Sequence, residues 1–333
     1  MKKPTLAVTM GDPSGIGPEL VLKVLSKEGT YGYCQPVVIG DPKVMKETGQ
    51  TMGFDLEIKT IRSISEAAFL FSHLEVLCPE GVDIQRFRWG KPDPAMGKAA
   101  GLCLEKAIRL AMEKKVDAVL SAPLNKEAFH LAGYPYQDEL AYLEELTQSR
   151  ETFTIGVMDR VWTVAVTSHI PFREIAGKIK RDRIARTIFL MDQTMRKAGV
   201  ARPKVAVAAL NVHGGEGGLI GREEIDEIGP AIEEGRRMDI EVEGPFGADT
   251  VFVRALAGEF DAVVCMYHDQ ANIARKLCVR RKGATIFMGL PVVCGTTAHG
   301  TAFDIAGRGI ADAGSMEDAI RYIAMLSSSA DSV

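Results

Sequence analysis

Three histidines stand directly after apolar segments that are typical of buried strands. In TVAVTSHIPF, KVAVAALNVHGGEGG and DAVVCMYHDQ, the strand is expected to run into a loop whose first polar residues include one of them: His169, His213 and His268. Imidazole nitrogens bind zinc and related divalent ions, and a set of three protein ligands leaves a coordination position open for substrate. One such histidine would more often cap a strand, but this setting recurs for three of the six histidines and therefore favours a catalytic metal site.

Two glycine-rich segments are candidate ligand loops. GDPSGIGPE, residues 11–19, follows an apolar strand and precedes a helix, where backbone N–H groups can meet an anion. Its spacing matches neither the G-x-G-x-x-G fingerprint nor the P-loop, so a dinucleotide would bind outside the ordinary Rossmann arrangement. TTAHGTAFDIAGRG, around His299, has small residues that let a flat or phosphorylated ligand approach the backbone, although such a segment alone is more often only a turn.

Short runs rich in valine, isoleucine and alanine alternate with segments of helical period, which predicts an α/β fold with largely parallel, buried strands. The predicted strands are Thr5–Met10, Pro36–Ile39, Leu74–Cys78, Ala118–Ser121, Phe153–Val157, Val161–Thr167, Lys204–Ala208, Ala262–Met266 and Ala284–Phe287. The predicted helices are Pro18–Ser26, Met96–Lys115, Lys126–Leu131, Leu140–Gln148, Phe172–Ile179, Asp182–Ala198, Glu223–Arg236 and Met316–Ser328.

Composition excludes several classes of protein. The 333 residues are 46% hydrophobic with a net charge of −4, which disfavours a disordered chain and a basic nucleic-acid binder. No apolar run is long enough to cross a bilayer, and the first apolar stretch is too short for a signal peptide. The six cysteines are scattered without a C-x-x-C pair. We expect a cytoplasmic protein with reduced thiols that uses neither membrane nor nucleic acid.

Seven motifs in order resemble the 4-hydroxythreonine-4-phosphate dehydrogenase (PdxA-type) family of vitamin B6 biosynthesis. They are GDPSGIGPE, SAPLNKEA, SHIPF, NVHGGEGG, GPFGADT, MYHDQ and HGTAFDIAGRG. The first and last also resemble motifs of isopropylmalate and isocitrate dehydrogenases. The resemblance implies that fold, with two α/β lobes, a cleft between them and a homodimer. We expect a cofactor-side lobe of residues 1–130 plus 300–333 and a metal and dimerisation lobe of residues 131–299.

The resemblance also implies roles for individual residues. His169, His213 and His268 would hold one divalent ion (zinc, cobalt, nickel, manganese or magnesium), with His268 offered across the dimer interface. Lys276 would contact substrate, and Asp249 would lie near the reacting hydroxyl. NAD or NADP would be bound by a set of loop residues: Gly11, Asp12, Gly15, Gly17, His299, Gly300, Thr301, Ala302, Asp304 and Gly307.

The chain departs from the family at four substrate-binding positions. Glu139 and Leu140 replace a His-Thr pair, Thr285 replaces an asparagine, and Cys294 replaces an arginine. An arginine fork suits a phosphate and an added carboxylate repels one, so phosphate recognition is expected to be altered. A basic run could supply the missing charge from new positions, although such a run is more often a solvated face; its residues are Arg275, Arg280, Arg281 and Lys282.

The leading hypothesis is therefore a metal-dependent NAD(P) dehydrogenase that oxidises a hydroxy acid and decarboxylates the β-keto product, with Lys276 as proton donor or carboxylate clamp. The small-molecule substrate would be a phosphorylated hydroxythreonine or threonate. One alternative is the same chemistry on an unphosphorylated sugar acid or cyclic dihydrodiol carboxylate, and the substitutions favour a divergent, catabolic paralogue. Another is a non-catalytic homologue that binds metal and NAD.

Overall fold

The computed structural model describes residues 3–71, 73–158, 161–278 and 283–328, and these form two compact units. Unit 1 comprises Met1–Thr152 and Leu290–Val333, and unit 2 comprises Phe153–Gly289. Residues 131–152 and 290–299, which we expected in the metal-side lobe, thus belong to unit 1. Within the described ranges, no helix is both long and apolar enough to cross a membrane.

Unit 1 contains parallel strands in the order β3-β4-β2-β1-β5-β12. Their bounds are β1 Thr5–Thr9, β2 Gln35–Ile39, β3 Glu57–Ile61, β4 His73–Leu77, β5 Ala118–Ser121 and β12 Val293–Thr297. The central strands β1 and β5 are buried throughout, as their continuous apolar sequences require.

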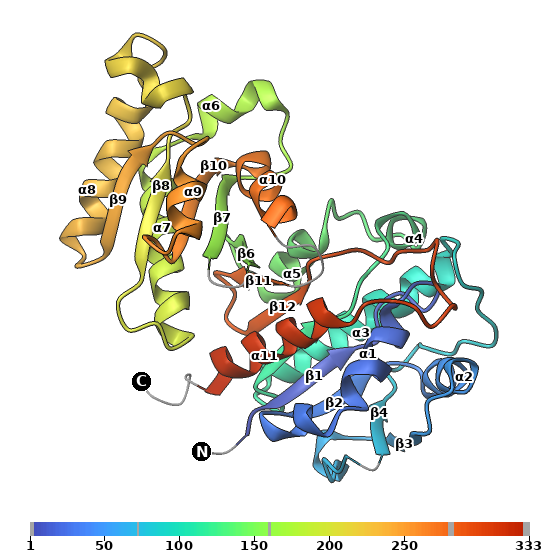
Figure 1. Cartoon of the computed structure of the whole chain (residues 1–333). Coiled ribbons are helices and arrows are strands. Elements are labelled where there is room, and N and C mark those ends of the chain that lie inside the picture. The colour runs from blue at the N-terminus through green and yellow to red at the C-terminus, as the bar shows by residue number, and fades with distance from the viewer. Residues whose placement is uncertain (1–2, 72, 159–160, 279–282, 329–333) are drawn as a thin grey trace. The chain divides into compact units, whose positions relative to one another are not determined.

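The helices of unit 1 pack on both sides of these strands. Their bounds are α1 Gly17–Leu25, α2 Pro42–Met52, α3 Pro94–Met112, α4 Lys126–Leu131, α5 Glu139–Thr147 and α11 Gly314–Ser328. α11 packs on β12, β5 and α1, whereas α3 packs on β1 and β5 and against α4 and α5 (Figure 1). Side chains of Asp41, Asp93, Asn125 and Asp138 accept backbone N–H groups and so fix where α2, α3, α4 and α5 begin.

Unit 2 contains strands in the order β11-β6-β7-β10-β8-β9. Their bounds are β6 Phe153–Met158, β7 Val161–Thr167, β8 Lys204–Ala208, β9 Glu241–Phe246, β10 Ala262–Tyr267 and β11 Ala284–Met288. β6 is antiparallel to β7 and to β11, and the other pairs are parallel. The helices are α6 Ile175–Lys178, α7 Arg181–Lys197, α8 Gly229–Arg237, α9 Val251–Leu256 and α10 His268–Cys278. α10 lies against β10, β7 and β6 (Figure 1).

The sequence predictions are confirmed for nine strands and, within a few residues at their ends, for most helices. They missed β3, β9 and β12 and the helices α2, α9 and α10. The expectation that His268 begins a loop was wrong, because it is the first residue of α10.

Candidate functional site

The three candidate metal ligands follow three adjacent parallel strands of unit 2. β10 lies between β7 and β8 and is parallel to both, so the three carboxyl ends meet at one edge. His169 comes two residues after β7, His268 directly after β10, and His213 in the glycine-rich turn after β8. His169 and His213 have φ values of +53° and +50°. Such left-handed geometry is uncommon outside glycine and is concentrated at functional sites.

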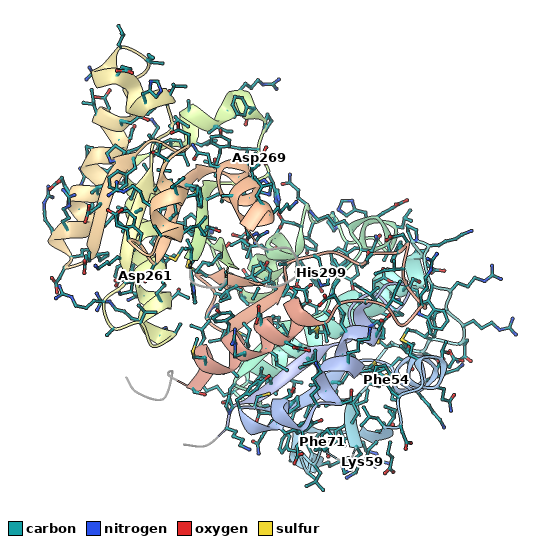
Figure 2. All side chains as sticks on the ribbon, viewed as in Figure 1. Phe54, Lys59, Phe71, Asp261, Asp269 and His299 are labelled. Carbon is teal, nitrogen blue, oxygen red and sulfur yellow. The ribbon has the colours of Figure 1, made fainter. Side chains whose placement is uncertain are left out.

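His169 and His268 lie together in one pocket. Their ring centroids are 5.7 Å apart, and Nδ1 of His268 is 2.7 Å from Oδ1 of Asp269, which is labelled in Figure 2. The pocket has a volume of about 240 Å³. Its wall combines polar strand-end residues with apolar side chains from the segment after His169: Thr167, Ser168, His169, Ile170, Phe172, Ile175, Tyr267, His268 and Asp269.

His213 is held in a separate, tightly bonded turn. The buried carboxylate of Glu224 accepts the backbone N–H groups of Leu210 and Asn211 at 2.8 and 2.7 Å and the Asn211 side-chain amide at 2.9 Å. Nδ1 of His213 lies 2.9 Å from Oε1 of Glu216. In the described part of one chain, no three His, Cys, Asp or Glu side chains are grouped closely enough to hold a metal ion. The structure therefore brings together His169 and His268, but not all three histidines.

The two catalytic candidates of unit 2 are both exposed. Lys276 lies on the last turns of α10, and Asp249 lies between β9 and α9. Thr285 is 7% exposed on β11.

Arg275 is less solvated than we expected from its place in a basic run. Its side chain lies over Gly156 of β6, where an added Cβ would be 2.7 Å from the arginine Cδ and 3.1 Å from Cζ. Burial lowers the pKa of Arg275, the direction expected for a desolvated cation. The other three basic residues of that run, Arg280, Arg281 and Lys282, lie outside the described residues.

The candidate cofactor loops belong to unit 1 and require glycine at close backbone contacts. Gly11 has φ +71°, and a Cβ there would be 2.6 Å from the Pro123 carbonyl oxygen. A Cβ at Gly15 would be 2.8 Å from Cβ of Thr301, whose carbonyl accepts the Ile16 N–H at 3.0 Å. The two glycine-rich segments predicted from the sequence are thus packed on each other.

Two buried polar atoms in the first loop have no hydrogen-bond partner among the described residues: Oδ2 of Asp12 and Oγ of Ser14. The other carboxylate oxygen of Asp12 accepts the Ser14 N–H at 2.8 Å. Burial raises the pKa of Asp12 to about 6, with a smaller contribution from Asp93 and an opposing one from the Ser14 hydrogen bond. Unsatisfied buried atoms of this kind mark a place where a ligand or water completes the bonding.

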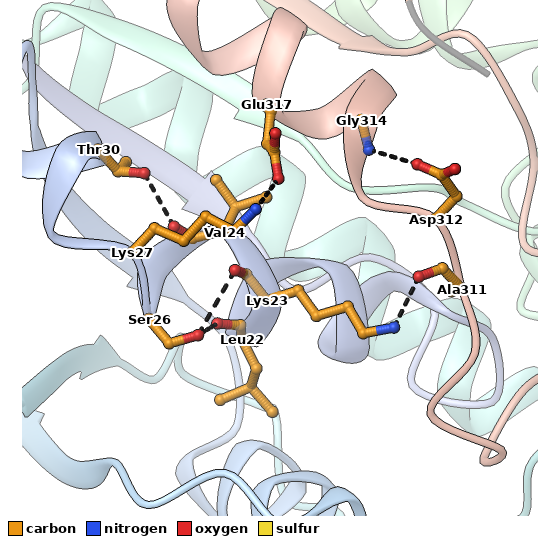
Figure 3. Close-up of polar contacts among 10 residues, drawn as sticks. All are labelled: Leu22, Lys23, Val24, Ser26, Lys27, Thr30, Ala311, Asp312, Gly314 and Glu317. Atoms are coloured by element: carbon orange, nitrogen blue, oxygen red, sulfur yellow. Dashed lines mark hydrogen bonds and ion pairs between the residues drawn. The ribbon is translucent and has the colours of Figure 1, made fainter.

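The second loop is anchored at its ends. Gly307, with φ +80°, packs against the ring of Trp89, and His299 and Asp304 are exposed. His299 is labelled in Figure 2. After the loop, Lys23 of α1 donates to the carbonyl of Gly309 at 2.9 Å. It also donates to the carbonyl of Ala311 at 2.6 Å (Figure 3). The remaining cofactor candidates, Gly17, Gly300 and Ala302, lie in the same two segments.

Glu139 and Cys294 are the substrate-binding candidates of unit 1 with buried polar atoms: Oε1 of Glu139 and the thiol of Cys294. Burial raises the pKa of Glu139 to about 7, against the lowering effect of the Ser121 hydroxyl, and Oε1 has no partner among the described residues. Burial, with a smaller effect of Glu139, raises the pKa of the Cys294 thiol well above its usual value. The expectation that Glu139 adds a full negative charge needs correction, because burial favours the protonated form of this carboxyl. Leu140 follows it on α5.

Sequence reasoning missed Phe172 and Tyr267 in the histidine pocket, Trp89 against Gly307, and the burial of Arg275. The aromatic residues had a usable signal, since Phe172 and Tyr267 stand within three residues of a candidate ligand. Trp89 had none, because it is far from the loop in sequence.

Comparison with known proteins gives one consistent result. Residues 32–323 match the family model of the pyridoxal phosphate biosynthetic protein PdxA. The chain is 39% identical over 328 residues to a D-threonate 4-phosphate dehydrogenase of Cupriavidus necator, covering 97% of both proteins. A 4-hydroxythreonine-4-phosphate dehydrogenase structure from Burkholderia phymatum matches with a TM-score of 0.84 at 37% identity, covering 98% of this chain and 99% of that one.

Two more distant structures extend the comparison. A terephthalate 1,2-cis-dihydrodiol dehydrogenase from Burkholderia xenovorans has a TM-score of 0.70 at 27% identity, covering 97% of this chain and 98% of that one. A beta-decarboxylating dehydrogenase from Thermococcus kodakarensis, at 15% identity and a TM-score of 0.51 over 97% of this chain and 82% of that one, shares the fold. The expected α/β fold of the isopropylmalate and isocitrate dehydrogenase type is confirmed.

Proposed function

This chain belongs to the pyridoxal phosphate biosynthetic protein PdxA family, and from that premise we propose that it is a decarboxylating dehydrogenase of a phosphorylated hydroxy acid. D-threonate 4-phosphate is the substrate we favour, because that name belongs to a relative 39% identical over 97% of the chain. The observation that carries the proposal is the position of His169, His268 and His213 after the adjacent parallel strands β7, β10 and β8.

The donor set fits a divalent ion such as zinc, cobalt, nickel, manganese or magnesium, since imidazole is a ligand for most of these metals. When bound at the histidines, the ion would acidify the substrate hydroxyl and stabilise the enolate left by loss of CO2. One chain groups only two of the three histidines. We propose a homodimer in which the partner subunit completes the site, and the family resemblance implies that His268 is the residue that crosses.

The unit 1 loops fit a nicotinamide dinucleotide, NAD or NADP, which would accept the hydride from the substrate carbon. Asp12 and Ser14 each offer a buried oxygen without a partner among the described residues, and the backbone of the second loop is open to close approach at Gly300. In this proposal these residues bind and orient the cofactor.

The protein's own residues move the protons. Asp249 is proposed to lie at the reacting hydroxyl, where it takes the O–H proton as the C–H hydride leaves. The β-keto acid then loses CO2, and its carbon takes a proton from the ammonium group of Lys276. The exposure of both side chains leaves them accessible to substrate.

The test is a comparison of NAD and NADP reduction with D-threonate 4-phosphate and with D-threonate, together with CO2 release. We expect turnover of the phosphorylated acid only, loss of turnover with chelator, and loss in a His213→Ala variant. His130→Ala is the matched control, since His130 is exposed on α4. Full activity in chelator, or in His213→Ala, would overturn the metal-dependent scheme.

A second substrate class is favoured by one specific finding, the likeness to the terephthalate dihydrodiol dehydrogenase at 27% identity. The arginine that the family carries is replaced by the buried Cys294 in this chain, which suits a substrate without phosphate. Turnover of an unphosphorylated dihydrodiol carboxylate but not of D-threonate 4-phosphate would establish that class. Binding of metal and NAD without reduction by any of these acids would instead support a non-catalytic homologue.

A further inference from the structure

Arg275 is a half-buried cation with no partner among the described residues. No hydrogen bond or ion pair joins its guanidinium to any other described residue. Burial of a charge is unfavourable unless it is paired, and arginine remains protonated even when desolvated. Among the described residues this guanidinium has no partner, so it can pair with an anion that binds from outside the chain.

Gly156 is what allows the arginine to occupy its place. The arginine side chain occupies the space that a side chain at position 156 would need. A Cβ added there would be 2.7 Å from Cδ and 3.1 Å from Cζ of Arg275. The side chain of Arg275 thus lies over β6 while remaining partly exposed.

The register of the sheet places a hydroxyl beside it. Gly156 pairs with Thr285 of β11 and with Thr163 of β7, and paired residues direct their side chains to the same face. Thr163 already donates to the Gly156 carbonyl at 3.2 Å. The Thr285 hydroxyl has no hydrogen bond to any described residue, so it is available on the face that Arg275 covers.

We propose that Arg275 and Thr285 bind an oxyanion of the substrate, its phosphate or its carboxylate. The planar guanidinium matches two oxygens of either group, and the threonine hydroxyl donates to a third atom or to the same oxygen. The family carries an arginine where this chain has Cys294. Arg275 would supply a guanidinium in its place, from α10. The inference rests on the proposed function for its substrate and adds the residue that recognises the acid group.

The kinetic test compares Arg275→Met and Arg275→Lys with wild type on D-threonate 4-phosphate. We expect KM to rise about 10- to 100-fold in Arg275→Met, with a smaller change in kcat, and Arg275→Lys to recover only part of the loss. Arg183→Met is the matched control. Arg183 is also a half-buried arginine of unit 2, but its guanidinium lies 4.7 Å from the Phe153 ring and Nε donates to the Val166 carbonyl.

A binding test keeps this inference separate from the enzyme's activity. Inorganic phosphate and acetate are titrated against the melting temperature of wild type, Arg275→Met and Gly156→Ala. If inorganic phosphate raises the melting temperature of wild type but not of the two variants, the site binds the substrate's phosphate. If acetate does so instead, the site binds the carboxylate. Unchanged protection by both anions, or a KM equal to that of Arg183→Met, would overturn the proposal. An inactive wild type that still shows Arg275-dependent protection would contradict only the proposed function.

Discussion

At the scale of single residues, Glu139 has a charge that depends on pH near neutrality. Its raised pKa, about 7, means that the folded protein binds the proton more tightly than the unfolded chain, where the value is 4.5. Stability therefore decreases as the pH rises between these two values and levels off above them. Ionisation of this group is unfavourable for the fold.

We predict that Glu139→Gln removes this pH dependence. Wild type and variant should melt at similar temperatures near about pH 5, and the variant should be more stable by about 1–3 kcal/mol near about pH 8. Thermal denaturation across this range checks it. Glu145→Gln, an exposed position on the same helix, should follow wild type at every pH. A constant difference between Glu139→Gln and wild type would contradict the raised pKa.

The roles of residues were predictable where the chain carries a motif. They were less predictable where packing determines whether a side chain is buried. The histidines were identified from repeated strand-end settings, and β7, β10 and β8 do place them on one edge. The states of Glu139 and Arg275 were not predictable, because burial determines both. A carboxylate at the start of a helix and an arginine in a basic run are ordinarily solvated.

At the scale of elements, the loop of residues 299–307 depends on contact with a distant aromatic ring. We predict that Gly307→Ala destabilises the protein by about 1–3 kcal/mol, because it adds a methyl group against Trp89 and requires a left-handed backbone at a residue with Cβ. Chemical denaturation measures this.

Gly300→Ala is the control for the same loop. No atom lies within 4 Å of an added Cβ there, and its φ is not in the left-handed region, so stability should change by less than about 0.5 kcal/mol. Equal losses in the two variants would show that the Trp89 contact does not hold the loop.

Prediction of elements succeeded for the buried strands and failed at sheet edges and at α10. β3 and β9 are edge strands with polar residues, so their apolar pattern is weak. α10 begins at His268 without a separating loop, and its first three residues, His268 to Gln270, are polar, as is usual for a loop after a strand. The helix that carries Lys276 and Arg275 was therefore read as a loop.

At the scale of the whole molecule, the proposed sharing of the metal site makes mixtures of inactive variants informative. If His169 and His213 come from one subunit and His268 from the other, mixing His213→Ala with His268→Ala yields mixed dimers with one intact site. About a quarter of wild-type activity should return. Subunit exchange followed by the dehydrogenase assay measures this.

The other two mixtures identify which histidine crosses the interface. His169→Ala with His268→Ala should recover activity, whereas His169→Ala with His213→Ala should not. The opposite result would mean that His213 crosses while His169 and His268 stay together, as their 5.7 Å ring separation allows. No recovery in any mixture would place all three ligands in one subunit and contradict the shared site.

The fold class was predictable because seven motifs in order resemble one family, and that resemblance implies its fold. The division into units was not predictable to the residue, since no linker separates them and the chain passes from one to the other at residues 152–153 and 289–290. Those crossings follow from packing of whole strands, which local sequence does not encode.

Unit 2 is one continuous segment inserted between β5 and β12 of unit 1. During synthesis on the ribosome, residues 153–289 are therefore complete before β12 and α11 have emerged. Unit 1, although it begins first, stays without the strand and helix that cover β5 until the last part of the chain is released. We expect unit 2 to fold before unit 1 is complete. Nascent chains at that stage would expose β5 to chaperones.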